Sequence, residues 1–247
     1  PSDNLSSETS YKIRVTTLVK DLVGNSMSNS YTTSNGFTSA DVTAPILSQV
    51  TAITTPTNDT TPSYAFSSSE AGTISYVGCS PGGTSAISGT NSISFNTLSE
   101  GSYSCTITVT DSAGNTSTAL RVNTFVVDTT APTVSSTSPI DNQSSVSISE
   151  NISVTFFETN MDTTSVTTNT SNTICSGSLQ LSSDSFSSCV QMGSSPTVSN
   201  DNQTIPVTPS LKMFYSTTYK IRVTTSAEDI VGYGITSQYT QMDGFKT

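Results

Sequence analysis

Hydrophobic and polar residues alternate with a period of two over much of this 247-residue chain. Near the C-terminus, Tyr219, Ile221 and Val223 are each separated by one polar residue. Successive side chains of a strand point to opposite faces of a sheet, so this period predicts a strand with one buried and one exposed face. Residues 228–232 then predict a turn, because they end in a glycine that readily adopts positive φ. A second strand is expected after the turn.

The same pattern occurs a second time near the N-terminus. Residues 11–39, the first copy, align without a gap with residues 219–247, the second copy. Tyr11, Ile13 and Val15 correspond to the inward-facing residues of the second copy. The copies are offset by roughly 208 residues, and self-similarity at a fixed offset marks an array of structural units. This offset is longer than one small module, so we expect two domains of different type within it.

Two linkers divide the chain into three parts. The sequence Asp-x-Thr-Ala-Pro occurs at 41–45 and at 128–132, each time just before a predicted strand. Proline restricts the backbone and stiffens such a joint. We therefore predict a β-sandwich over 45–128 and another over 133–247. Residues 1–40 are predicted to be the C-terminal half of a domain of the same type as 133–247.

The strand spacing predicts the architecture of the middle part. Its predicted strands are separated by turn-forming residues and span 46–53, 63–69, 73–77, 92–95, 103–110 and 120–127. Short strands at this spacing indicate a sandwich. The fold class is therefore all-β, with tandem immunoglobulin-like β-sandwich domains in an extended array.

Four cysteines fall into two pairs along the chain. Cys79 and Cys105 lie in the middle part, and Cys175 and Cys189 lie in the last. Four cysteines allow three connectivities, and pairing within each domain is the simplest. Disulfides imply an oxidising compartment, whereas the alternative is four buried thiols in a cytosolic protein. The Ser-rich segment between Cys175 and Cys189 predicts a short hairpin-like insertion.

Composition supports the all-β interpretation and narrows the function. The chain has 49 Ser and 45 Thr but few charged residues, and threonine favours pleated strands. The net charge of −10 argues against nucleic acid as a partner. No apolar run of about 18 residues or more predicts a membrane span.

Catalysis is not predicted. The chain contains no histidine, which excludes His-dependent triads and His-ligated metal sites. It also lacks the Gly-x-Ser-x-Gly sequence of a nucleophile elbow. We therefore expect a protein that is not an enzyme and that needs no cofactor, with calcium as the one ion to consider.

The last two parts resemble known families. In the last part, the motifs follow one another as Ala131-Pro132, Ser138-Pro139, Val154-Thr155-Phe156, Pro209, Thr218-Tyr219, Asp229-Ile230-Val231-Gly232 and Phe245-Lys246-Thr247. This order resembles the bacterial Ig-like domain of S-layer-type and other surface proteins. The middle part, with Gly101-Ser102-Tyr103 and residues 109–115, is similar to the Ig-like repeats of large bacterial adhesins. In the last part, Tyr233 replaces Asn25 of the first copy, which predicts a turn of different conformation.

The resemblance implies a bacterial protein at the cell surface or outside the cell. These modules mostly serve as stalks, so the expected function is a structural segment of a stalk or filament, with neighbouring copies of the same repeat or subunit as partners. The alternative is an adhesin domain that binds a glycan or a protein through the 175–189 insertion, because this loop exceeds what a sandwich needs.

The linker aspartates Asp41 and Asp128 are candidate calcium ligands. Near turn residues such as Asp111 or Glu70, they could share an ion across a domain joint, as the resemblance to adhesin repeats implies. Calcium takes about six to eight oxygen ligands, and the Asp-x-Asp-x-Asp-Gly loop that supplies them is missing from the sequence. The alternative, in which both aspartates only form turns, therefore remains open.

Residues 1–40 predict two strands without a facing sheet. Two strands alone are marginal in water. We expect their complement either upstream in a longer polypeptide or in another subunit that exchanges strands.

Overall fold

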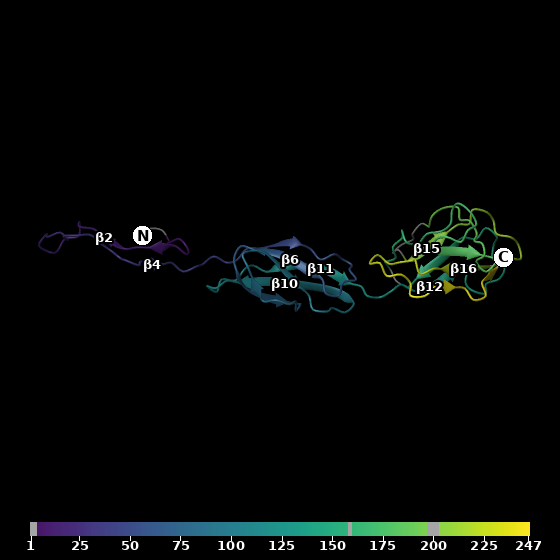
Figure 1. Ribbon diagram of the computed structural model, residues 1–247, viewed down its shortest axis with the longest axis horizontal. Coiled ribbons are helices and arrows are strands. Elements are labelled where there is room, and N and C mark those ends of the chain that lie inside the picture. The colour runs from purple at the N-terminus through teal and green to yellow at the C-terminus, as the bar shows by residue number, and fades with distance from the viewer. Residues whose placement is uncertain (1–3, 158–159, 197–202) are drawn as a thin grey trace. The chain divides into compact units, whose positions relative to one another are not determined.

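The computed structural model describes residues 4–157, 160–196 and 203–247, and it is built from strands joined by turns (Figure 1). The described residues contain no helix, and therefore none that could cross a membrane. The all-β prediction is confirmed. The chain forms two compact units, which consist of Pro1–Thr54, Thr61–Leu98 and Tyr103–Phe125, and of Thr55–Thr60, Ser99–Ser102 and Val126–Thr247.

The first copy of the repeat forms two small antiparallel ladders. Strand β1 (Ser10–Tyr11) pairs with β4 (Phe37–Thr38), and β2 (Arg14–Val15) pairs with β3 (Tyr31–Thr32). Ile13 remains 57% exposed and Phe37 46% exposed. Within the described part of the chain, no facing sheet covers this copy.

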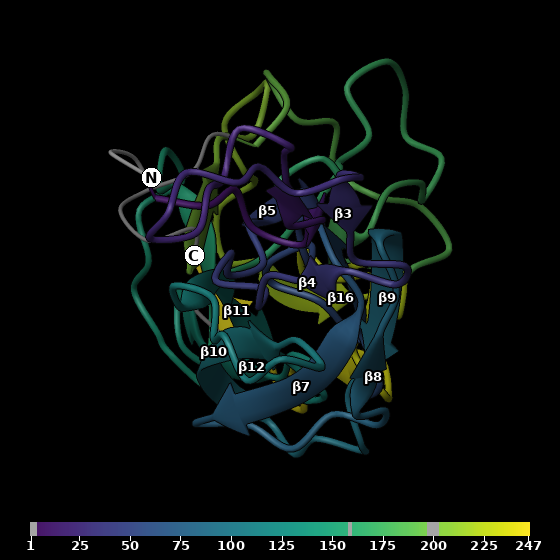
Figure 2. The ribbon, with the colours of Figure 1, turned by 90° about the vertical axis from the view of Figure 1, so that its left-hand side faces the viewer.

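The middle part is a sandwich of two antiparallel sheets. One sheet has the order β5 (Leu47–Thr51), β6 (Ser63–Ser68), β9 (Gly89–Ser94). The other has the order β11 (Leu120–Val127), β10 (Gly101–Thr110), β7 (Gly72–Val77), β8 (Ser85–Ala86). Figure 2 shows β7 beside β8, with which it pairs.

The core of this sandwich follows the period-two pattern of its strands. Tyr64 and Phe66 from β6 are fully buried, as are Ile107 and Val109 from β10. Phe125 from β11 is also fully buried, and its ring meets those of neighbouring aromatic residues. Burial of alternate side chains from both inner faces is what holds two such sheets together.

The last part is a second sandwich. Its three-stranded sheet has the order β12 (Val134–Ser138), β13 (Ile152–Phe156), β15 (Thr204–Val207). Its other sheet has the order β14 (Leu179–Ser182), β16 (Thr218–Val223), β17 (Tyr239–Thr240), and β18 (Phe245–Lys246) also pairs with β16. The inward residues of β16 lie in the same hydrophobic core as those of β13. They are therefore buried, unlike their counterparts in the first copy.

The sequence predicted a hairpin-like insertion between Cys175 and Cys189, and this prediction was wrong. The segment contains β14, whose Leu179 and Leu181 are buried and pair with Val223 and Ile221 of β16. The two leucines alternate within a serine-rich run and supply core contacts that the sandwich needs. This strand is therefore an integral part of the second sheet.

One turn occurs three times with the same geometry. The Oδ1 atoms of Asp21, Asp111 and Asp229 each accept hydrogen bonds from the backbone N–H groups two and four residues later. The glycine three residues after each aspartate has φ of 94°, 95° and 93°. The prediction that Tyr233 changes the turn was therefore wrong, because backbone groups define the turn and any side chain can follow the glycine.

Candidate functional site

Three carboxylates meet at the first linker. Asp41 comes from the linker, Glu70 from the turn between β6 and β7, and Asp111 from the turn after β10. Each offers one oxygen, and these oxygens all lie within 4.8 Å of one another. The structure thus places together the groups that the sequence suggested as partners of Asp41.

Hydrogen bonds hold the linker at this position. The Ser7 hydroxyl donates to Asp41 Oδ1 at 3.1 Å, and the Val42 N–H donates to the Ser7 hydroxyl at 3.1 Å. On the other side, Asn115 Nδ2 donates to the Asp41 carbonyl at 3.3 Å. The linker is therefore bonded to both the first copy and the middle sandwich.

The charges at this cluster are not compensated by the protein. The pKa of Glu70 is raised, first by burial and then by the negative charges of Asp41, Asp111 and Glu8. Burial also raises the pKa of Asp111, but hydrogen bonds from Asn115 and other turn residues outweigh it and leave the pKa lowered. Among the described residues, no lysine or arginine forms an ion pair with these carboxylates. A cation would therefore relieve a real repulsion.

At the second linker, the charge of one buried carboxylate acts on another. Asp128 and Asp229 are 8% and 1% exposed. The pKa of Asp128 is raised, chiefly by burial, and the charges of Asp229 and Glu100 raise it further, while a hydrogen bond from the Thr130 N–H lowers it. Asp229 Oδ2 is buried and has no hydrogen-bond partner among the residues that the structure describes.

The orphaned oxygen of Asp229 has a cause in the sequence. In the other two turns, the side chains of Asn25 and Asn115 donate to Oδ2 of the turn aspartate at 2.9 Å. Tyr233 stands at this position in the third turn and makes no such bond. An unpartnered buried oxygen is costly, so it marks a place that suits a cation.

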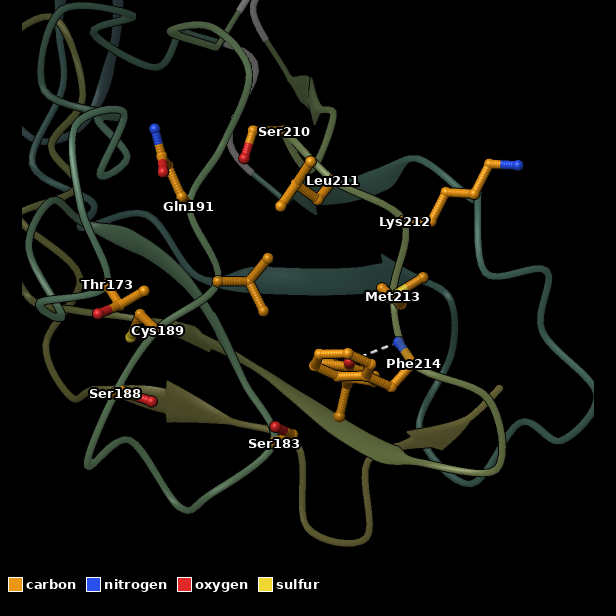
Figure 3. A pocket seen from close by; sticks show the side chains of 12 residues that line it. Thr173, Ser183, Ser188, Cys189, Gln191, Ser210, Leu211, Lys212, Met213 and Phe214 are labelled. Carbon is orange, nitrogen blue, oxygen red and sulfur yellow. Dashed lines mark hydrogen bonds between the residues drawn. The ribbon is translucent and has the colours of Figure 1, made fainter.

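A pocket lies beside the segment that ends at Cys189 (Figure 3). Its volume is about 340 Å³. One wall comes from this segment and the other from the loop between β15 and β16, which carries Leu211 and Phe214.

Two disulfides are present in the structure. The Cα–Cα distance is 5.4 Å for Cys79–Cys105 and 4.9 Å for Cys175–Cys189.

Phe186, the aromatic residue between Cys175 and Cys189, does not line this pocket. The Arg222 guanidinium lies over the ring of Phe186, 3.9 Å from its centroid, and covers one face of that ring. The exposed aromatic residue that lines the pocket is Phe214, and Tyr215, also exposed, follows it in the chain. Sequence analysis passed over them because they lie in a loop outside the cysteine pair.

Two family models, both described as bacterial Ig-like domain, match residues 48–129 and 128–247. Residues 48–247 are two bacterial Ig-like domains in tandem. No curated protein matches the chain.

Among the solved structures that match the chain, one is similar at low identity. It is SGBP-B of the Bacteroides ovatus mixed-linkage glucan utilization locus, in complex with a mixed-linkage heptasaccharide. The identity is 12%, and the match covers 95% of this chain and 53% of that one, with a TM-score of 0.20. The chain thus spans about half the length of that protein, and so weak a similarity carries no information about the role of these Ig-like domains.

Sequence analysis identified some residues of the carboxylate sites and missed others. It named Asp41 and Asp128, and it named Glu70 and Asp111 as their neighbours. It missed Asp229 of the second Ig-like domain. The signal that could have found it is the loss of the asparagine that serves the same aspartate in the other two turns.

Proposed function

We propose that this chain is a structural segment of an extracellular or cell-surface repeat protein, a stalk or filament of Ig-like domains whose joints bind calcium. Bacterial Ig-like domains are generally non-enzymatic, and the proposal includes no catalytic activity. Disulfides fit an oxidising environment outside the cytoplasm. Neighbouring copies of the same repeat would be the partners.

The observation that carries the calcium proposal is the convergence of Asp41, Glu70 and Asp111 at one linker. Calcium prefers carboxylate and carbonyl oxygens, and these three residues supply the carboxylates. At the other linker, we extend the proposal to Asp128 and Asp229, because Asp229 Oδ2 is buried without a hydrogen-bond partner among the described residues. A bound ion would neutralise the charges and fix the linker to the neighbouring turns.

Titration calorimetry of the full chain with calcium tests this site. We expect binding that weakens about tenfold or more in Glu70→Gln and Asp111→Asn, because each change removes one charge and a strong oxygen ligand. Both substitutions keep the side-chain shape, and Asn keeps the oxygen that the turn amides require. The raised pKa of Glu70 also predicts that affinity falls as the pH falls through that pKa, since protons then compete with calcium.

The matched control is Asp21→Asn. Asp21 occupies the same turn in the first copy, but it belongs to no cluster of acidic residues among those described. This variant should bind calcium like the unaltered chain. Equal affinity in all four proteins, or no calcium binding at all, would leave the linker aspartates as turn formers.

A second candidate function is adhesion to a glycan or protein beside the 175–189 segment. The pocket next to this segment favours it. The site would then be built by β14, which also belongs to the core, and by the loop before β16.

A further inference from the structure

The loop before β16 differs between the two copies in a way that the fold does not require. Where the first copy has small polar or acidic residues, the second has large apolar or aromatic ones: Leu211 for Asp3, Phe214 for Ser6 and Tyr215 for Ser7. The backbone is nevertheless held by the same bond. Tyr11 Oη accepts from the Ser6 N–H at 2.8 Å, and Tyr219 Oη accepts from the Phe214 N–H at 3.0 Å.

These large side chains are not used by the core. Leu211 is 80% exposed, Phe214 74% and Tyr215 78%. Single exposed hydrophobic residues need no explanation, but an apolar patch with a polar rim marks an interaction site. Since the first copy keeps the same backbone hydrogen bond with serine, we infer that these residues serve a ligand rather than the fold.

Hydroxyl groups line both walls of the pocket. Thr173, Ser183 and Ser210 line it, and their hydroxyls form no hydrogen bond with another residue in the described part of the chain. Among the residues that the structure describes, no carboxylate lines the pocket. The side chain of Lys212 extends away from the other lining residues (Figure 3). The pocket therefore combines an apolar side with neutral polar groups.

The walls of the pocket are fixed before any ligand arrives. The Ser210 N–H donates to the Gln191 carbonyl at 2.9 Å, which joins the loop to the Cys189 segment. The Cys189 N–H donates to the Thr173 carbonyl at 2.8 Å, and the disulfide holds the same segment. A pocket formed in advance loses less free energy in ordering its side chains upon binding.

We propose that this pocket binds a neutral saccharide, with Leu211 and Phe214 as its apolar contacts. A sugar ring presents C–H groups on its faces and hydroxyl groups at its edge, so it needs an apolar surface beside hydroxyl and amide partners. The volume of about 340 Å³ lies within the usual range for small-ligand sites. A charged ligand would find no oppositely charged group directed at it. The proposal rests on the second candidate function, for which it names the class of ligand, and it does not depend on calcium.

The test is a binding measurement with the full 247-residue chain and a panel of neutral gluco-, galacto- and mannohexaoses, in EGTA. We expect at least one of them to bind with a Kd of about 1 mM or tighter. The triple variant Leu211→Asp, Phe214→Ser, Tyr215→Ser carries the residues of the first copy. It should bind about tenfold more weakly or worse, with its circular dichroism unchanged.

The control is Lys212→Asn, which also carries the first copy's residue at a side chain that points away from the pocket. It should bind like the unaltered chain. If the triple variant does not fold, Phe214→Ser alone provides the comparison. The proposal is overturned if no hexaose binds or if the variant lacking the apolar residues binds equally well. Because EGTA is present, failure of the calcium site would leave this result unchanged.

Discussion

Replacing Ile221 by alanine will destabilise the second Ig-like domain by about 2–5 kcal/mol, the usual cost of such a truncation in a packed core. Replacing Ile13 by alanine will change the free energy of unfolding by less than about 0.5 kcal/mol. The two isoleucines occupy the same position of the repeat. Ile221 is fully buried against residues of the facing sheet, whereas Ile13 is 57% exposed.

Urea denaturation of the two variants, followed by circular dichroism, measures this difference. Each variant serves as the control for the other, because both lose an isoleucine side chain from the same position of the repeat. Equal destabilisation of the two variants would mean that the first copy is covered by a sheet of its own in solution. Such a result would contradict the burial described for residues 10–38.

Replacing both Cys175 and Cys189 by serine will destabilise the same domain by about 3 kcal/mol, as expected when a closed loop of roughly 15 residues is opened. The sequence separation of the bonded pair is 14. The bond constrains the segment that carries β14, whose Leu179 and Leu181 belong to the core. Without the bond, only side-chain packing and the pairing with β16 order this edge strand.

Peptide mapping without reductant must first show that Cys175 is bonded to Cys189. Thermal unfolding of the double-serine variant then measures the loss of stability of the second Ig-like domain. The reduced but unaltered chain provides the comparison, because it keeps both side chains. Unchanged unfolding of the variant would show that β14 is held without the bond, and a crosslink between the middle and last parts would contradict the pairing.

Much of the fold could be predicted from the sequence because the period of two is unusually regular. A strand was predicted over 103–110, and in β10 the alternate residues Cys105, Ile107 and Val109 are buried, while Tyr103 is half-buried. The failure at β14 has a physical reason. Leu179 and Leu181 give only two apolar positions in a serine-rich run, which is too short a pattern to distinguish a core strand from a surface hairpin.

The candidate sites were predictable only in part. Asp41 could be matched with Glu70 and Asp111 because turns at one end of a sandwich lie near each other. The unpartnered oxygen of Asp229 depends on a hydrogen bond that is missing in three dimensions, and sequence alone does not show this. Phe214 was missed because its exposure follows from the path of a loop, which no period describes.

Small-angle scattering of the full chain, with calcium and with EGTA, tests the central claim most directly. If calcium at Asp41 and Asp128 stiffens the joints, chelation will broaden the distribution of interdomain distances and change the maximum dimension. Circular dichroism will stay the same, because each Ig-like core is independent of its linker. Scattering curves that coincide with and without calcium would contradict a structural segment whose joints are fixed by the ion.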